Sequence, residues 1–171
     1  MNNQSIKELF LMMGRTEQYM PSPNDVVADN EIITSISQIG DLELKDRMGR
    51  TLLMNAAFYG RYDVVQYLIN HGASIHATCK QNFTALHGAT MFRHIDVVKL
   101  LIENGADVNA RDMWGNSPLM RCDLATPDEL FRILIRAGAN PAQQNNYGQS
   151  ALDVFEAYPN ILALLQSCDE S

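Results

Sequence analysis

The sequence has few of the residues that build disulfide cross-links and metal centres. Its 171 residues include three cysteines, an odd number, with neither a CxxC motif nor the Cys and His spacing of a metal site. Cys79, Cys122 and Cys168 are therefore predicted to be free thiols, as expected in a reducing cytoplasm. We expect no disulfide and no metal ion.

Long hydrophobic runs are also missing. The apolar stretch near the N-terminus contains Lys7 and Glu8, and no longer hydrophobic segment follows it. Neither a signal peptide nor a transmembrane helix is therefore expected, and we expect no membrane binding. The sequence also has no glycine-rich phosphate loop after a strand, so we expect no nucleotide and no other cofactor.

Positive charge is scarce. Thirteen Lys and Arg residues stand against 20 Asp and Glu residues, which gives a formal net charge of −7 at pH 7. The acids gather at both ends, within residues 1–43 and 153–171, and leave the middle of the chain mildly basic. Because such a chain repels a phosphate backbone, nucleic acid is not expected as a partner.

What the chain does have is internal repetition. Threonine, leucine, valine and glycine recur 33 residues apart in Thr51 and Thr84, Leu53 and Leu86, Val64 and Val97, and Gly72 and Gly105. The same step continues to glycines 115, 138 and 148. Four repeats are predicted, at residues 46–78, 79–111, 112–144 and 145–171.

Residues 82–111 indicate what each repeat contains. Thr84 is expected to cap a short helix, because its hydroxyl can accept a backbone N–H two or three residues further on. A second helix follows, with an apolar stripe over residues 97–102. Gly105 is expected to end this helix, since glycine readily takes the positive φ found just past a helix end.

Residues 84–89, T-A-L-H-G-A, resemble the T-P-L-H-x-A motif of ankyrin repeats, which also have a period of 33 residues. The resemblance implies an all-α ankyrin-repeat solenoid of stacked helix-turn-helix units with short β-hairpin tips. Repeat one departs from the motif at Leu52 and Met54, but neither change threatens the helix.

The first 44 residues are predicted to form a helical cap with a degenerate repeat, continuous with the repeats of residues 45–171. One helix is expected from Ser5 to Met13, with Ser5 and Glu8 as a capping box, and another over residues 25–39. Terminal repeats need polar outer faces for solubility, which accounts for the acids at both ends.

Repeat three departs furthest from the pattern. Cys122 and Asp123 replace small residues of its first helix, which we expect to be shifted. Its second helix has a strong start signal, with Thr126 as the predicted N-cap, Pro127 in the first turn and Glu129 three residues after the cap. This second helix is expected to be well formed.

Two groups of side chains in the sequence are of types that can carry chemistry. The histidines are expected to serve in packing and turns and not in a metal site; they are His71, His76, His87 and His94. Asp123 and Glu156 stand at equivalent positions of adjacent inner helices, and paired inward carboxylates can perform acid–base catalysis. No nucleophile or substrate pocket can be identified with them, so we predict no catalytic residue and no enzyme activity.

Ankyrin repeats generally bind other proteins through the tips and the exposed side of each first helix, and the resemblance implies the same here. Those positions hold aromatic, methionine and basic residues, of which the aromatic, methionine and arginine types are enriched in interface cores. The predicted partner-binding residues are Arg47, Met48, Arg50, Phe58, Tyr59, Lys80, Gln81, Phe83, Met91, Phe92, Arg111, Met113, Trp114, Asn116 and Tyr147. The alternative is that some, Phe58 and Phe92 especially, wedge between neighbouring inner helices.

The sequence thus predicts a non-catalytic module that binds a folded partner protein through the tips and the concave inner-helix face. The basic residues at the tips favour a partner with an acidic and apolar patch. The roles left open are an inhibitor, an immunity-type neutraliser of a toxin or enzyme, and an adaptor. An inhibitor or neutraliser is favoured, because an adaptor would need a second interaction surface and only the N-terminal 44 residues are available for one. A host-directed effector is the alternative, and an enzyme using Asp123 and Glu156 is less favoured. The free protein is expected to be a cytoplasmic monomer.

Overall fold

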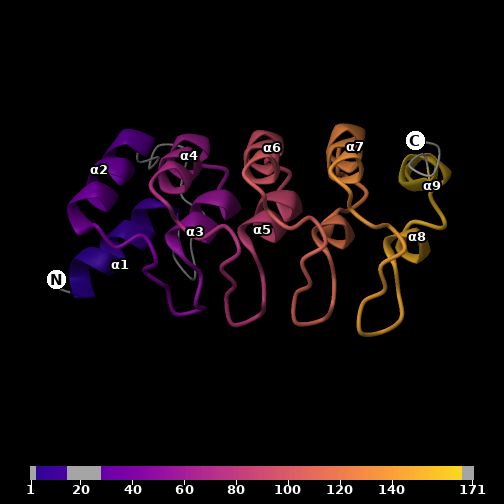
Figure 1. The fold of residues 1–171 in the computed structure, drawn as a ribbon, viewed down its shortest axis with the longest axis horizontal. Coiled ribbons are helices and arrows are strands. Elements are labelled where there is room, and N and C mark those ends of the chain that lie inside the picture. The colour runs from indigo at the N-terminus through magenta and orange to yellow at the C-terminus, as the bar shows by residue number, and fades with distance from the viewer. Residues whose placement is uncertain (1–2, 15–27, 167–171) are drawn as a thin grey trace.

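Helix pairs lie side by side in a row along the long axis of the molecule (Figure 1). The structure is a computed structural model that describes residues 3–14 and 28–166. Its elements are α1 (Asn3–Met12), α2 (Asp29–Ile39), α3 (Leu52–Phe58), α4 (Tyr62–Asn70), α5 (Ala85–Met91), α6 (Ile95–Glu103), the 3-10 helix η1 (Pro118–Arg121), α7 (Asp128–Arg136), α8 (Ala151–Val154) and α9 (Pro159–Gln166). The predicted all-α repeat solenoid is confirmed.

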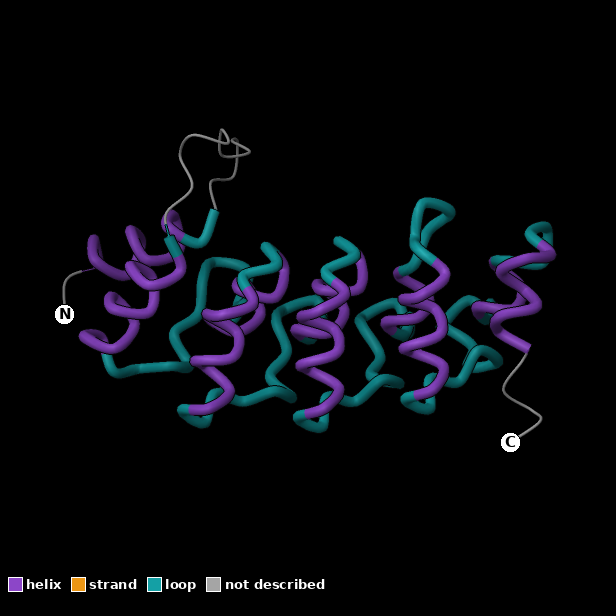
Figure 2. The backbone as a smooth tube through the Cα atoms, turned by 90° about the horizontal axis from the view of Figure 1, so that it is seen from above, coloured by secondary structure: helices purple, strands orange, loops and turns teal. Residues whose placement is uncertain are grey.

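The helices form two layers. Helices α2, α4, α6, α7 and α9 make an outer layer, α1, α3, α5 and α8 lie in an inner layer, and four loops project beyond the inner layer (Figure 1). Viewed from above, the outer helices lie side by side along the long axis of the molecule (Figure 2). The apolar core runs between the layers and between neighbouring repeats, from Leu9 to Leu165. Stability therefore accumulates along the stack.

The four projecting loops, which we call the tips, are five-residue turns over residues 46–50, 79–83, 112–116 and 145–149. In each tip the N–H of the first residue donates to the carbonyl of the fifth, and the N–H of the fourth donates to the carbonyl of the first. The fourth residue has a positive φ, from 56° at Asn82 to 80° at Gly115. Within the described chain the tips contain no paired strands, only an isolated bridge between Lys45 and Thr51, so they are turns and not β-hairpins.

Successive tips are joined by backbone hydrogen bonds. In each case the N–H of the second residue of a tip donates to the carbonyl of the third residue in the tip before. The N···O distances are 3.1 Å from Lys80 to Met48, 2.9 Å from Met113 to Gln81 and 2.9 Å from Asn146 to Trp114. These bonds fix the spacing of the side chains that the tips present.

The inner helices begin at hydroxyl caps. Thr51 accepts the N–H of Met54, and Thr84 accepts the N–H of His87 while the His87 ring accepts the N–H of Thr84. The prediction that Thr84 caps its helix is confirmed, with His87 completing a capping box. The predicted end at Gly105 is also confirmed, since Gly105 follows α6 with a φ of 87°.

Repeat three has only the four-residue η1 where repeats one and two have seven-residue inner helices. The predicted Thr126 cap is wrong, because α7 begins at Asp128 and Pro127 occupies the cap position. The Thr126 hydroxyl instead accepts the N–H of Asp123 at 2.9 Å and donates to its carboxylate at 3.1 Å. Thr126 thus stabilises the loop before α7.

The N-terminal helices differ from the prediction in their bounds. Helix α1 begins at Asn3, so Ser5 lies inside the helix, and its predicted role as N-cap is wrong. Helix α2 begins at Asp29 and ends at Ile39, with Gly40 as its C-cap, whereas residues 25–27 of the predicted helix lie outside the described residues. Helix α2 packs against α4, as α4 packs against α6 and α7 against α9. The division of the chain at residue 44 stays a prediction.

The cap at Thr84 gives a direct test of the local structure. Thr84→Ala removes the hydroxyl that accepts the His87 N–H and should lower the free energy of unfolding by about 1 kcal/mol, as measured by urea denaturation. Thr78→Ala is the matched control, since Thr78 lies exposed in a loop. Equal losses for the two variants would contradict the capping role.

Candidate partner-binding face

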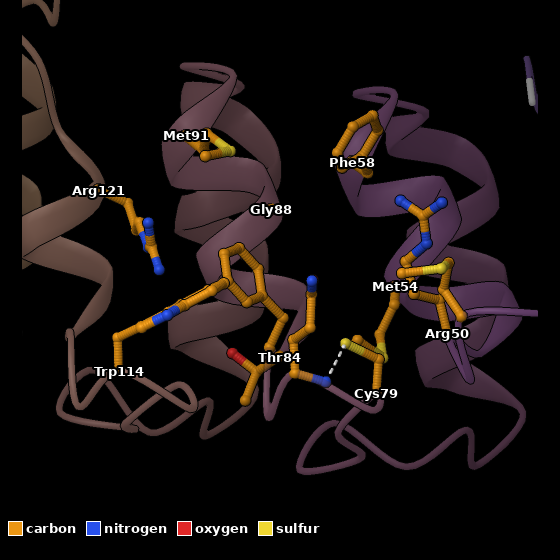
Figure 3. A pocket seen from close by; sticks show the side chains of 12 residues that line it. Arg50, Met54, Phe58, Cys79, Thr84, Gly88, Met91, Trp114 and Arg121 are labelled. Atoms are coloured by element: carbon orange, nitrogen blue, oxygen red, sulfur yellow. Dashed lines mark hydrogen bonds between the residues drawn. The ribbon is translucent and has the colours of Figure 1, made fainter. Parts of the chain in front are cut away.

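A pocket of about 300 Å³ opens on the inner-layer side of repeats one to three (Figure 3). Three successive repeats contribute its walls, which are mostly apolar, aromatic or thioether side chains with two arginines among them. The lining residues are Met48, Arg50, Met54, Phe58, Cys79, Gln81, Phe83, Thr84, Gly88, Met91, Trp114 and Arg121.

The pocket can be traced to two positions of the repeat. The first residue of a tip and the residue nine positions later form a polar pair in repeats one and three. Asn55 donates to the Asp46 carboxylate at 3.1 Å, and Arg121 donates to the Asp112 carboxylate. Both pairs bring polar side chains to the inner-layer side of the helix.

Repeat two has Cys79 and Gly88 at the same two positions, so it has neither an acid nor a side-chain donor there. Both residues line the pocket. The Cys79 sulfur accepts the Gln81 N–H at 3.4 Å. The pocket is therefore the space that a polar pair fills in the two neighbouring repeats.

The two arginines of the pocket are held against aromatic rings. The Arg121 guanidinium lies 4.7 Å from the centroid of the Phe83 ring and 5.4 Å from that of Trp114, and the Arg50 guanidinium lies 5.2 Å from that of Phe58. These distances allow cation–π attraction. Arg50 also pairs with Asp46, its Nε lying 3.1 Å from the Oδ2.

Arg121 retains unused hydrogen-bonding capacity. One terminal nitrogen donates to Asp112, whereas its buried Nε has no partner among the described residues. Burial lowers the pKa of Arg121. A buried donor without a partner costs free energy, so this guanidinium favours an additional acceptor.

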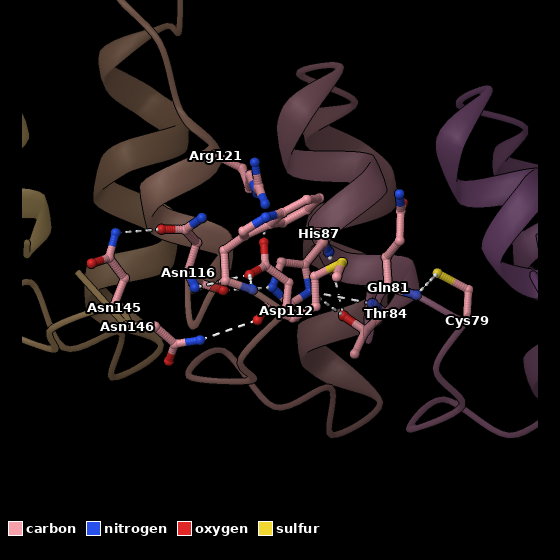
Figure 4. A network of polar contacts seen from close by, with 11 residues as sticks. Cys79, Gln81, Thr84, His87, Asp112, Asn116, Arg121, Asn145 and Asn146 are labelled. Atoms are coloured by element: carbon pink, nitrogen blue, oxygen red, sulfur yellow. Dashed lines mark hydrogen bonds and ion pairs between the residues drawn. The ribbon is translucent and has the colours of Figure 1, made fainter.

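His87 links Thr84, the N-cap of α5, to the tip of repeat three (Figure 4). Its Nδ1 accepts the Thr84 N–H at 3.2 Å, and its Nε2 lies 3.1 Å from the Asn116 carbonyl oxygen, to which it donates. These partners require the neutral tautomer with the proton on Nε2. Burial accordingly lowers the pKa of His87 to about 4.

Seven of the fifteen predicted binding residues meet at this pocket: Met48, Arg50, Phe58, Gln81, Phe83, Met91 and Trp114. Four of the others are exposed nearby on tips or at an inner-helix end: Lys80, Phe92, Met113 and Tyr147. Arg47 is an exposed tip residue, and Tyr59 is half-buried against the core. The Tyr59 ring also lies against Gly14, just after α1.

Two predicted residues make their hydrogen bonds within the solenoid. Arg111 donates to the Gln144 carbonyl at 2.7 Å and to the Asn146 side chain at 3.3 Å. Asn116 accepts from the side chains of His87 and Asn145. Both side chains therefore tie neighbouring repeats together.

Phe58 and Phe92 lie much as the alternative interpretation expects, in which they wedge between neighbouring inner helices. Their ring centroids lie 4.2 Å apart, so the two aromatic side chains pack together between neighbouring repeats. Phe92 nevertheless remains 39% exposed. The pair thus ties the inner layer together and also contributes to its surface.

Sequence reasoning missed five lining residues: Met54, Cys79, Thr84, Gly88 and Arg121. The signal for the pair at 79 and 88 is present in the alignment of the repeats with one another. Repeat two is the copy with cysteine at the first tip position and glycine nine residues later. Reading the repeats against each other for missing side chains could have found the pocket.

The candidate catalytic carboxylates do not form an inward pair. Asp123 lies in the loop after η1, its side chain is 55% exposed, and it pairs with Arg93 at 2.6 Å. This hydrogen bond is the main cause of a lowered pKa at Asp123. Glu156 is exposed as well. Asp123 therefore stays an ionised structural partner.

Histidine and cysteine side chains have structural surroundings. The His94 Nε2 lies 3.0 Å from the Phe58 carbonyl oxygen, and burial lowers the pKa of His94. Cys79 and Cys122 are buried free thiols, and burial raises the pKa of Cys122 to about 12. Over residues 3–14 and 28–166, no three His, Cys, Asp or Glu side chains are grouped as a metal ion would need. The expected lack of a metal stays a prediction.

The stacked helix pairs, hydroxyl caps and projecting tips define a helical-repeat protein with one face suited to binding. A family model for ankyrin repeats in three copies matches residues 26–112, just over half of the chain. The chain belongs to the ankyrin-repeat family, and is accordingly a protein–protein interaction module. A comparison with curated proteins found no match.

The family is generally non-catalytic. Among the helices that the structure describes, none has both the length and the apolar character needed to cross a bilayer.

The neutral His87 predicts a stability that depends on pH. Between pH 6.5 and 4 the unfolded chain binds a proton that the folded protein does not, so stability falls as the pH falls. The loss from pH 7 to pH 5 is about 2 kcal/mol from this group, measured by urea denaturation. His94 adds to the loss, because its pKa is also lowered.

The control variants separate this effect from general acid denaturation. His87→Gln should lose less stability between pH 7 and pH 5 than the natural protein, whereas the exposed His76→Gln should behave like the natural protein. A pH dependence unchanged in His87→Gln would contradict the neutral, hydrogen-bonded His87.

Proposed function

We propose that this protein binds a folded partner through its inner face, meaning the tips and the exposed side of the inner helices, and that it inhibits or neutralises that partner. The observation that carries the proposal is the apolar pocket of about 300 Å³ at the centre of this face. Concave, mostly apolar sites with a few polar groups are the default binding sites of proteins.

Exposed apolar side chains around the pocket support the same face. Met48 and Met91 line the pocket and are 39% and 36% exposed, and Met113, next to Trp114 on the tip of repeat three, is 49% exposed. A solenoid does not need these side chains for folding. Exposed apolar groups gathered around a pocket are typical of interaction surfaces, and methionine adapts well to a partner.

The chemistry of the inner face favours an acidic and apolar protein as partner. The pocket is lined by Arg50 and Arg121 and by no acid, while Lys80 and Arg47 lie exposed on the adjacent tips. Nucleic acid is a poorer match, since the net charge of −7 opposes a phosphate backbone. We also propose a monomeric free protein in the cytoplasm, where the buried thiols of Cys79 and Cys122 would stay reduced.

Inhibition is the simplest consequence of such binding. A rigid face that covers a functional surface of its partner blocks that surface without any chemistry of its own. The inner face extends over four repeats, which gives it the length to cover an active site or a toxic surface.

The test starts from the partner, isolated from cells that make this protein and identified by mass spectrometry. Phe92→Ala should weaken its binding by about 2 kcal/mol, because exposed aromatic side chains at an interface centre are frequent hot spots. Titration calorimetry measures the affinity, and assays of the partner with and without this protein measure inhibition.

The control is Gln66→Ala, at an exposed position of the outer helix α4. Melting temperatures of both variants exclude a general loss of fold. The assignment of the binding site to the inner face is wrong if Phe92→Ala leaves the affinity unchanged while Lys99→Ala or Glu103→Ala, on the outer helix α6, lowers it. An isolated partner whose activity is unaffected by binding would contradict inhibition.

A further inference from the structure

The pocket of the inner face is lined by aromatic, methionine and arginine side chains, which together favour one kind of occupant. This inference rests on the proposed function. We propose that the pocket receives an aromatic side chain of the partner, and that carboxylates beside this side chain in the partner's sequence bind Arg50 and Arg121.

The size and the walls of the pocket suit an aromatic ring. A volume of about 300 Å³ is at the lower end of ligand pockets, which fits one large anchor better than an extended ligand. Phe58, Phe83 and Trp114 offer rings for edge-to-face or offset contact. Thioether sulfurs also contact ring edges favourably, and three methionines line the pocket.

Gly88 leaves room for the incoming ring. Gly88 lies in the middle of α5 and lines the pocket, so a larger side chain at position 88 would enter the pocket (Figure 3). A Cβ added at Gly88 would lie 3.5 Å from the Phe58 Cα, an ordinary van der Waals distance. Glycine is therefore not required here by a close approach, and its φ is not positive. Its effect is to keep the space open.

Arg50 and Arg121 are the reason to expect carboxylates beside the aromatic side chain of the partner. Arg50 and Arg121 belong to the repeats on either side of Gly88, so a ring seated over Gly88 lies between two guanidinium groups (Figure 3). Arg121 has a buried Nε without a partner in the described chain. A carboxylate is the strongest acceptor that a protein partner can offer to it.

The acids near these arginines do not cancel the attraction at the pocket. Asp46 accepts the N–H groups of Met48 and Arg50 at one oxygen, and the side chains of Arg50 and Asn55 at the other. Asp112 accepts two tip N–H groups at Oδ1 and Arg121 at Oδ2. Neither acid lines the pocket. The pocket surface therefore presents guanidinium and no carboxylate.

Short peptides test this occupant without knowledge of the partner. The probe is acetyl-Glu-Phe-Glu-amide, titrated to about 10 mM into the isotope-labelled full chain and followed by NMR at the Gly88 amide, the Trp114 indole and the Arg121 Nε–H, since anchor contacts alone give weak binding. Two matched peptides separate the contributions: acetyl-Gln-Phe-Gln-amide lacks the charge, and acetyl-Glu-Ala-Glu-amide lacks the ring.

The first peptide should shift all three signals, and each matched peptide should bind at least about tenfold more weakly, as expected when a central anchor or its charge pair is removed. Equal binding of the alanine peptide would reduce the interaction to charge alone. No shift at the highest concentration would overturn the proposal.

A variant that fills the pocket tests the location. Cys79→Asp/Gly88→Arg recreates in repeat two the pair that Asp112 and Arg121 form in repeat three, so the fold should be retained. The variant should lose the peptide shifts. Thr78→Asp/Gln66→Arg adds the same two charges at exposed positions outside the pocket and should keep them. If the filled variant unfolds, Gly88→Ala is the smaller change, and it should weaken binding while the melting temperature is maintained.

The partner itself distinguishes this inference from the proposed function. If the filled variant binds the isolated partner normally while Phe92→Ala does not, the inner face binds the partner but the pocket does not hold its anchor. If neither change matters, the proposed face fails as well.

Discussion

The structure depends on how each tip satisfies the backbone N–H groups of its own turn. In three tips one side-chain oxygen at the first residue accepts two of them, at the third and fifth residues. The first residues are Asp46, Asp112 and Asn145, whereas Cys79 accepts one N–H through sulfur. Local acceptors of this kind compete with regular strands, which explains why the tips are turns.

The same acceptor determines what the inner face presents. An acid at the first tip position attracts a donor nine residues later, Asn55 or Arg121, and holds it against the inner helices. Repeat two has no acid there and no donor, and it leaves a pocket between two held arginines. Because packing against rings restrains these arginines, the proposed binding of a partner to them would cost less conformational entropy.

The repeat architecture could be predicted from the sequence because its recurring residues follow from the local backbone. Thr51 and Thr84 cap helix N-termini, and the glycines 33 residues apart take positive φ. The detailed site could not, because it depends on which tip residue bonds across to the next repeat. Arg111 and Asn116 look like exposed binding residues in the sequence, yet they tie repeats together. Thr126 reads as a helix cap, but its hydroxyl is hydrogen-bonded to Asp123 instead.

In the proposed function, the pocket side of the inner layer binds the partner. Methyl-labelled methionine NMR of the full chain tests it most directly, since Met48, Met54 and Met91 line the pocket whereas Met12 packs against Ser35 of α2. On saturation with the isolated partner, the three pocket methyl signals should shift and the Met12 signal should stay in place. A stable complex that leaves all three pocket signals unmoved would contradict binding at the pocket.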